Sequence, residues 1–149
     1  MSEFRGPNSH IHNIARGLLV QGGDIILCRT KNAEWFFLPG GHIEDGESAH
    51  TALKRELEEE MGGMDYSVSS FIGACENIFP LEDNVFQHEL NIVFRVEVSQ
   101  DSRIGSVEDH IEFVNVSSKE FQEVKVLPRA LHEGLIAWQE TGTPFFKEL

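Results

Sequence analysis

A helix over residues 48–61 is the feature that most restricts how this chain can fold. The stretch SAHTALKRELEEEM is rich in strong helix formers. Asp45 or Ser48 can cap its start, and Gly62-Gly63 can end it through a left-handed C-cap. Three of its residues form an apolar stripe: Leu53, Leu57 and Met61. This stripe fixes the helix against a core, and so also fixes where its charged side chains point.

The last turns of this helix carry an unfavourable concentration of negative charge. Glu56, Glu59 and Glu60 stand at i, i+3 and i+4, so they project from one face and repel one another by about 0.2–0.5 kcal/mol per pair. The helix dipole adds to the penalty, because its carboxyl end is already partly negative. A bound divalent cation would offset this repulsion, and carboxylate oxygens suit Mg²⁺ or Mn²⁺. The alternative is that the glutamates only keep the helix soluble.

The rest of the chain predicts a mixed α/β fold. We expect strands before and after the first helix in the sequence, and two further helices near the end of the chain. The expected strands are 14–20, 25–29, 35–41, 66–79, 88–99 and 111–116, and the expected helices are 117–124 and 128–140. An acidic loop, PLEDNVFQ, is expected between the two longest strands. This order predicts a single domain over residues 1–149, an α/β sandwich with helices on both sides of a mixed sheet, and a loose tail at residues 1–10.

Composition narrows the classes of partner. The chain has 12 Lys and Arg against 25 Asp and Glu, a net charge of −13, which disfavours long nucleic acids and anionic membranes. No run of 18 apolar residues and no signal-like N-terminal segment occurs, so we expect a cytoplasmic protein. Cys28 and Cys75 lie in apolar stretches and are expected to be buried free thiols.

The residues around the helix form a spaced pattern. Starting at Gly41, the chain reads glycine, five residues, Glu47, seven residues, Arg55-Glu56-Leu57, one residue, Glu59-Glu60, one residue and a glycine. The stretch from Gly41 to Gly63 thereby resembles the Nudix box, G-x5-E-x7-R-E-U-x-E-E-x-G-U with U bulky and apolar. Only the last U differs, since Gly63 stands there. With the preceding LPGG and the strand order, the chain is similar to the Nudix hydrolases over residues 12–140.

The resemblance implies a role for each fixed residue of the pattern. Glu56, Glu59 and Glu60 would bind Mg²⁺ or Mn²⁺, together with the backbone carbonyl of Gly40. Arg55 and Glu47 would tie the loop to the helix and orient Glu56, whereas Glu58 would be solvated.

Members of the family often use a further carboxylate, as metal ligand or general base, from a loop beyond the box. Glu112, in EDHIEFVNV, is our candidate for that group. Glu108, Asp109 and Glu89 compete with it.

Other side chains have local explanations as well as functional ones. His88 and His110 stand beside acidic residues, where local hydrogen bonds are the simpler interpretation. His10 and His12 could bind a metal only as an exposed pair. Trp35, Phe36 and Phe37 are either core residues or candidates for stacking on a base.

The resemblance implies hydrolysis of a diphosphate linked to another group in a small nucleotide. Nucleoside triphosphates and nucleoside diphosphate sugars, including ADP-ribose, both fit, and both a monomer and a homodimer are compatible with the family. Two alternatives belong to other classes of protein: a noncatalytic Nudix-fold nucleotide sensor, and a structural acidic helix without a ligand.

Overall fold

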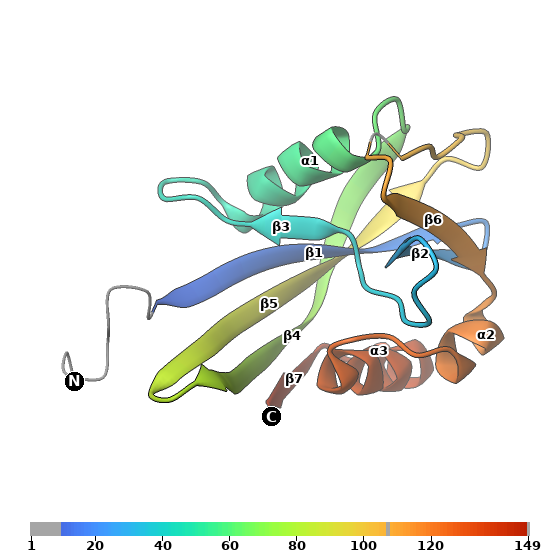
Figure 1. Cartoon of the computed structure of the whole chain (residues 1–149). Coiled ribbons are helices and arrows are strands. Elements are labelled where there is room, and N and C mark those ends of the chain that lie inside the picture. Colours follow the sequence, from blue (N-terminus) through green and yellow to red (C-terminus); the bar gives the residue numbers. More distant parts are fainter. Residues whose placement is uncertain (1–9, 107, 149) are drawn as a thin grey trace.

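The computed structural model describes residues 10–106 and 108–148 (Figure 1). In chain order the elements are β1 (Ile11–Gln21), β2 (Asp24–Thr30), β3 (Gly40–His42), α1 (Ala49–Glu60), β4 (Tyr66–Glu82), β5 (Val85–Val98), β6 (Ile111–Val116), α2 (Ser118–Glu123), α3 (Arg129–Thr141) and β7 (Phe145–Glu148). The predicted tail falls on residues 1–9, outside the described residues, apart from His10.

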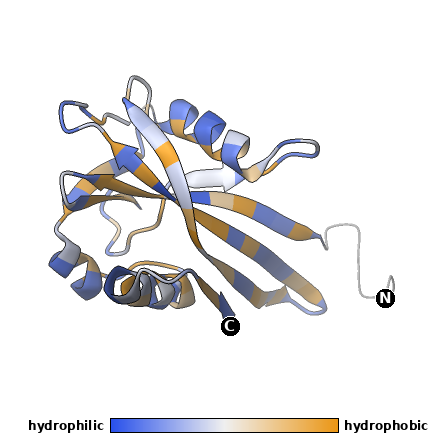
Figure 2. Cartoon of the chain, turned by 180° about the vertical axis from the view of Figure 1, so that it is seen from behind, coloured by the Kyte–Doolittle hydropathy of each residue, from blue (hydrophilic) through white to orange (hydrophobic). Residues whose placement is uncertain are grey.

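The strands form one seven-stranded mixed sheet in the order β6-β2-β1-β5-β4-β7, with β3 paired to β1. β1 runs parallel to β5 and antiparallel to β2 and β3. Hydrophobic and hydrophilic bands alternate along the long strands (Figure 2), as expected where successive side chains point to opposite faces.

Helices cover both faces of the sheet (Figure 1). Leu19 packs in one core with Leu53 and Leu57 of α1, and the neighbouring Leu18 packs in the other core with Leu131 of α3. Because adjacent residues of one strand serve two different cores, the sheet is the middle layer of a sandwich. This confirms the predicted fold class, and it places the acidic face of α1 outside the first core.

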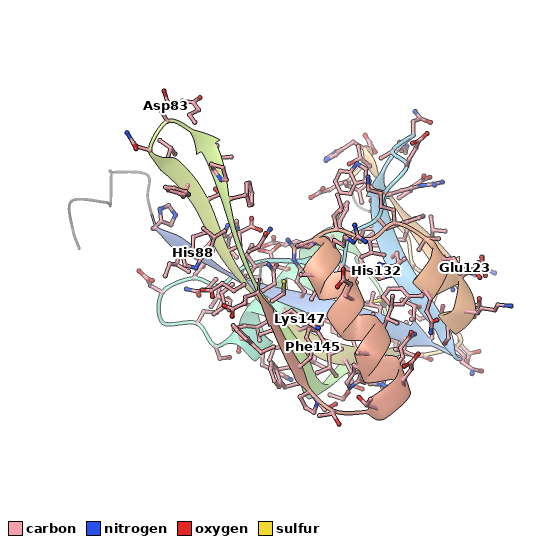
Figure 3. The ribbon with its side chains drawn as sticks, turned by 90° about the horizontal axis from the view of Figure 1, so that it is seen from below. Asp83, His88, Glu123, His132, Phe145 and Lys147 are labelled. Carbon is pink, nitrogen blue, oxygen red and sulfur yellow. The ribbon has the colours of Figure 1, made fainter. Side chains whose placement is uncertain are left out.

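The predicted acidic loop is wrong. Residues 80–87 instead continue the two strands into a hairpin, in which Asp83 and Asn84 make the turn and Asn84 has φ 61°. Figure 3 shows Asp83 at the tip of this hairpin. Asparagine tolerates positive φ, so a two-residue turn forms without glycine.

The predicted strand over residues 35–41 is also wrong. Phe36 and Phe37 make only single bridges, to Val126 and to Cys28. The regular strand begins later, at Gly40, because Gly40 and Gly41 pair with β1. The two glycines therefore belong to the sheet and lie next to the helix that follows.

The C-terminal residues form an unpredicted strand. β7 runs parallel to β4, and Phe145 lies between sheet and helix (Figure 3). A Cβ atom on Gly73 or Gly134 would stand 2.3 or 2.4 Å from the Phe145 ring. The two glycines leave the space that this ring fills, so the end of the chain docks on its own domain.

The helix starts match their sequence signals with small shifts, whereas the predicted left-handed C-cap of α1 is displaced: Met61 is the C-cap, with φ −136°, and Gly63 has the positive φ. Ser48, rather than Asp45, caps α1, and Pro128 is the N-cap of α3 rather than part of its first turn. Cys28 and Cys75 are buried and free, as predicted. Within the described part of the chain, no helix has the length and apolarity needed to cross a membrane.

Candidate active site

The orientation of α1 is set at its N-terminus and along its buried face. The Ser48 side chain accepts a hydrogen bond from the Thr51 backbone at 3.1 Å, which satisfies an N–H group that the helix leaves open. Ala52, Leu53 and Leu57 are completely buried. The side chains on the opposite side of the helix therefore point away from the core, with Glu58 exposed as predicted.

Two glycines bring backbone against this helix. Gly40 has φ 143°, and a Cβ atom there would lie 2.0 Å from the carbonyl oxygen of Ala15. A Cβ atom on Gly41 would lie 2.3 Å from the carboxyl carbon of Glu56. The backbone N–H of Gly40 donates a hydrogen bond to Glu60 at 3.3 Å. Gly40 therefore lets β3 lie close to β1, and Gly41 lets β3 lie close to Glu56.

Arg55 connects the loop, the strand and the helix. Its guanidinium donates to both carboxylate oxygens of Glu47, at 2.8 and 2.9 Å. The same group donates to Glu56 and to the backbone carbonyl of His42, each at 3.0 Å. The hydrogen bonds from Arg55 hold the pKa of Glu47 down, at about 2, and those bonds raise the pKa of Arg55. Both groups are thus charged across the pH range in which the protein would work, and they fix the direction of Glu56.

The glutamates face a common pocket of about 320 Å³. Its lining consists of Phe37, Gly40, Gly41, His42, Glu56, Glu59, Glu60, Glu108 and Ile111. A larger cavity of about 540 Å³ lies on the other face of the sheet, beside α2 and α3. We assign the site to the smaller pocket, because the carboxylates and the glycine backbone converge there.

The pKa of Glu60 reflects its surroundings in the pocket. Burial, together with repulsion from the nearby carboxylates of Glu56 and Glu108, raises the pKa of Glu60 to about 7. The Gly40 N–H and the charge of Arg16 act in the opposite direction, and they do not cancel the effect. A cation in the pocket would relieve this repulsion.

The donor set of the pocket fits Mg²⁺ or Mn²⁺. Apart from His42, every ionisable side chain that lines the pocket is a carboxylate, and hard divalent cations prefer oxygen ligands. Within residues 10–106 and 108–148, no three such side chains already stand in a coordinating arrangement. Glu56 accepts a hydrogen bond from Arg55, and Glu60 accepts one from the Gly40 N–H.

The structure does not bring Glu112 to the pocket. Glu112 lies in β6 opposite Arg29 of β2, and the two side chains form an ion pair. Its neighbour Ile111 lines the pocket, and successive strand residues point to opposite faces. Glu108, the competing candidate, takes the place beside Glu56, Glu59 and Glu60.

The remaining sequence candidates have local contacts. His88 lies 2.8 Å from the carboxylate of Glu76, and His110 lies 3.6 Å from that of Glu108. Phe36 belongs to the core and Phe37 lines the pocket, whereas Trp35 is exposed, with its ring 5.9 Å from that of Phe37. Sequence reasoning missed His42 and Ile111 of the lining. The alternation of side chains in the strand 111–116 could have indicated Ile111.

Comparison with known proteins shows the family of this chain. A family model described as the NUDIX domain matches residues 11–142. No curated protein matches the chain.

Several solved structures share the fold. A MutT protein from Methanosarcina mazei Go1 has a TM-score of 0.72 and 21% identity, covering 92% of this chain and 99% of its own. The E. coli ORF135 protein has a TM-score of 0.68 and 20% identity, covering 90% and 96%. A UDP-X diphosphatase has a TM-score of 0.67 and 18% identity, covering 95% and 69%. Because the family model spans most of the sequence, this chain belongs to the Nudix hydrolases.

Proposed function

We propose that this Nudix hydrolase is a divalent-metal-dependent pyrophosphohydrolase. Its substrate would be a nucleoside diphosphate linked to another moiety, and the bond cleaved would be a diphosphate bond. One observation carries the proposal: Glu56, Glu59, Glu60 and Glu108 line a single pocket under the backbone of two glycines. Four carboxylates would repel a phosphorylated substrate, so the arrangement is suited to phosphate only with cations between the two.

The residues divide into ligands and positioning groups. Glu56, Glu59, Glu60 and the carbonyl of Gly40 would hold Mg²⁺ or Mn²⁺. The bound cation would neutralise negative charge on the phosphate oxygens, and it would make a water molecule bound to it more acidic. Arg55 and Glu47 are positioning residues, because neither lines the pocket. Glu47 holds Arg55, and Arg55 in turn fixes the direction of Glu56.

The reaction needs a proton acceptor. The oxygen of a water forms a bond to one phosphorus, the bridging P–O bond breaks, and two phosphate-bearing products leave. Glu108, rather than Glu112, is our candidate to accept a proton from the attacking water, since Glu108 lines the pocket and Glu112 is paired with Arg29.

The substrate is proposed at the level of class. Nucleoside triphosphates and nucleoside diphosphate sugars, including ADP-ribose, have the required diphosphate. Phe37 supplies an aromatic side chain at the pocket that suits a ring of the substrate. One structural relative is a UDP-X diphosphatase, which supports including UDP-linked compounds among the test substrates.

The test is a panel of nucleoside triphosphates, ADP-ribose, nucleotide sugars and a dinucleoside tetraphosphate, each with Mg²⁺ and with Mn²⁺. Release of phosphate, pyrophosphate and nucleoside monophosphate would be measured. Glu59→Gln should lower turnover by roughly 10²-fold or more, since it removes a ligand of the cation that would stabilise charge on the phosphate. Glu58→Gln is the matched control, because Glu58 is exposed on the same helix and lies outside the pocket lining.

The outcomes separate the proposal from its rivals. Metal-dependent turnover that is lost in Glu59→Gln and kept in Glu58→Gln supports the enzyme. Nucleotide binding without turnover would instead support a sensor. Equal loss in both variants would mean that the helix face acts through its total charge and not through the pocket.

A further inference from the structure

Three histidines meet at the start of β1 and the end of β3. The Nδ1 atom of His12 lies 3.0 Å from the Nε2 atom of His42. The ring of His10 lies 4.2 Å from that of His12, centroid to centroid, and the rings of His12 and His42 are 5.1 Å apart. His12 is therefore the middle of a contiguous group of imidazoles, which we call the histidine cluster: His10, His12 and His42.

The sheet register brings the cluster together. Ile14 of β1 pairs with His42 of β3, and His12 precedes Ile14 by two residues, so His12 points to the same face. This makes His12 a diagonal neighbour of His42, within reach of a long side chain. On its other side His12 pairs with Glu89 of β5, which adds a carboxylate to the same face.

A single hydrogen bond between two neutral imidazoles accounts for the contact, but it leaves the third ring unexplained. Two nitrogens that are each ~2.1 Å from a shared cation lie ~3.0–3.4 Å apart. The separation of His12 and His42 is in this range without any movement. Among the described residues no complete three-ligand site is present, and a rotation of the His10 side chain would supply the third nitrogen.

We propose that His12 and His42 chelate a transition-metal cation of the Zn²⁺, Ni²⁺ or Cu²⁺ class, with His10 as a third ligand. Imidazole nitrogen suits these cations, whereas Mg²⁺ prefers the oxygens of the carboxylate pocket. The two sites are therefore distinguished by ligand chemistry. The carboxylate of Glu89, which pairs with His12, places a negative charge beside the cluster and so favours a cation there.

Occupancy would tie together two strands on which the carboxylate pocket is built. His42 lines that pocket, and its backbone carbonyl accepts a hydrogen bond from Arg55. A cation shared by His12 and His42 would link β1 to the end of β3. Binding should therefore stabilise the native state by mass action, as any ligand specific to the folded chain does.

The direct test is isothermal titration calorimetry of the whole chain with NiCl₂ and with ZnCl₂, in a noncoordinating buffer containing a large excess of Mg²⁺. One site per chain is expected. His12→Gln and His42→Gln should each weaken binding roughly tenfold or more, which corresponds to about 1.4 kcal/mol. His10→Gln should weaken it less. His50→Gln is the matched control, because His50 is an exposed histidine of α1 outside the cluster.

Copper provides a readout that is independent of affinity. The electron paramagnetic resonance spectrum of the Cu²⁺ complex should show coupling to two or three nitrogens, and His42→Gln should remove one of them. Glu59→Gln should leave this spectrum and the Ni²⁺ isotherm unchanged, so the result does not depend on the proposed hydrolysis. No saturable binding, or binding that survives in both His12→Gln and His42→Gln, would overturn the proposal.

Discussion

Gly41 and the carboxylate of Glu56 are in such close contact that no side chain fits between them. A Cβ atom on Gly41 would stand 2.3 Å from the carboxyl carbon of Glu56 and 2.5 Å from both of its oxygens. The obstacle is the far end of a flexible side chain, so the fold can accommodate an added methyl group by moving the carboxylate. Gly41 thus determines where Glu56 points more than it determines stability.

Gly41→Ala should therefore impair activity while leaving the fold intact. Displacement of Glu56 breaks its alignment with the pocket, and we expect turnover to fall roughly 10²-fold, as misplacement of a reacting group by about 1 Å does. Thermal unfolding followed by circular dichroism should show a small shift. A Gly41→Ala variant that unfolds at a much lower temperature would contradict the assignment, because the clash would then involve the backbone.

Gly40→Ala should behave in the opposite way. Its Cβ atom would lie 2.0 Å from the Ala15 carbonyl oxygen, and the residue has φ 143°, which L-amino acids rarely adopt. The backbone of β1 cannot move aside without breaking the pairing of β1 and β3. We expect a loss of about 2 kcal/mol or more in the free energy of unfolding. Urea denaturation of the two glycine variants side by side is the measurement.

Arg55→Lys should separate charge from geometry. Lysine keeps the positive charge, but it cannot donate to Glu47 and Glu56 at the same time in the fork that Arg55 uses. We expect kcat to fall roughly tenfold or more, with little change in the unfolding temperature. If Arg55→Lys keeps full activity, then the charge alone is sufficient and the fork of hydrogen bonds is incidental.

The helix and the row of glutamates on one of its faces could be predicted from sequence because their signals are local. The cap at Ser48, the apolar stripe and the glycines after Met61 lie within one continuous stretch, so their spacing alone aligns the glutamates on one face. The same reasoning failed for the turn at Asp83 and Asn84. Acidic residues were interpreted as a loop, although a projecting hairpin exposes such residues equally well.

The distal carboxylate could not be chosen from sequence because its place depends on pairing between distant strands. Glu108 and Glu112 both lie in the acidic stretch before and within β6. Which of them reaches the pocket depends on the register of β6 against β2, in which Glu112 stands opposite Arg29. Strand β7 was missed for a similar reason, since its partner β4 lies far away in the sequence.

Glu108→Gln and Glu112→Gln form a matched pair for this point. Glu108→Gln should lower kcat by roughly 10²-fold or more, as removal of a general base does. Glu112→Gln should lower kcat by less than about tenfold, since it loses only an ion pair with Arg29 at a partly exposed position. The reverse order of effects would restore Glu112 as the proton acceptor.

The pocket should also make the metal-free protein less stable as the pH rises. The pKa of Glu60 is about 7 in the folded protein, against 4.5 for an unperturbed glutamate. Between these values the folded state keeps a proton that the unfolded state has released. Because the unfolded state binds fewer protons there, the free energy of unfolding falls as pH increases from about 4.5 to about 7 and is then level.

Glu60→Gln should remove this dependence, because glutamine stays neutral. In the presence of a chelator, the variant should match the wild type near pH 4.5 and exceed it by about 3 kcal/mol above pH 7. Urea denaturation across this pH range measures the difference. Glu58→Gln, on the exposed side of α1, should show no such difference and serves as the control.

In the wild type, Mg²⁺ or Mn²⁺ must displace the Glu60 proton, so apparent metal affinity should rise up to about pH 7. A wild type whose stability is constant over this range would mean that Glu60 is already ionised and that the carboxylates do not repel one another as the pocket implies.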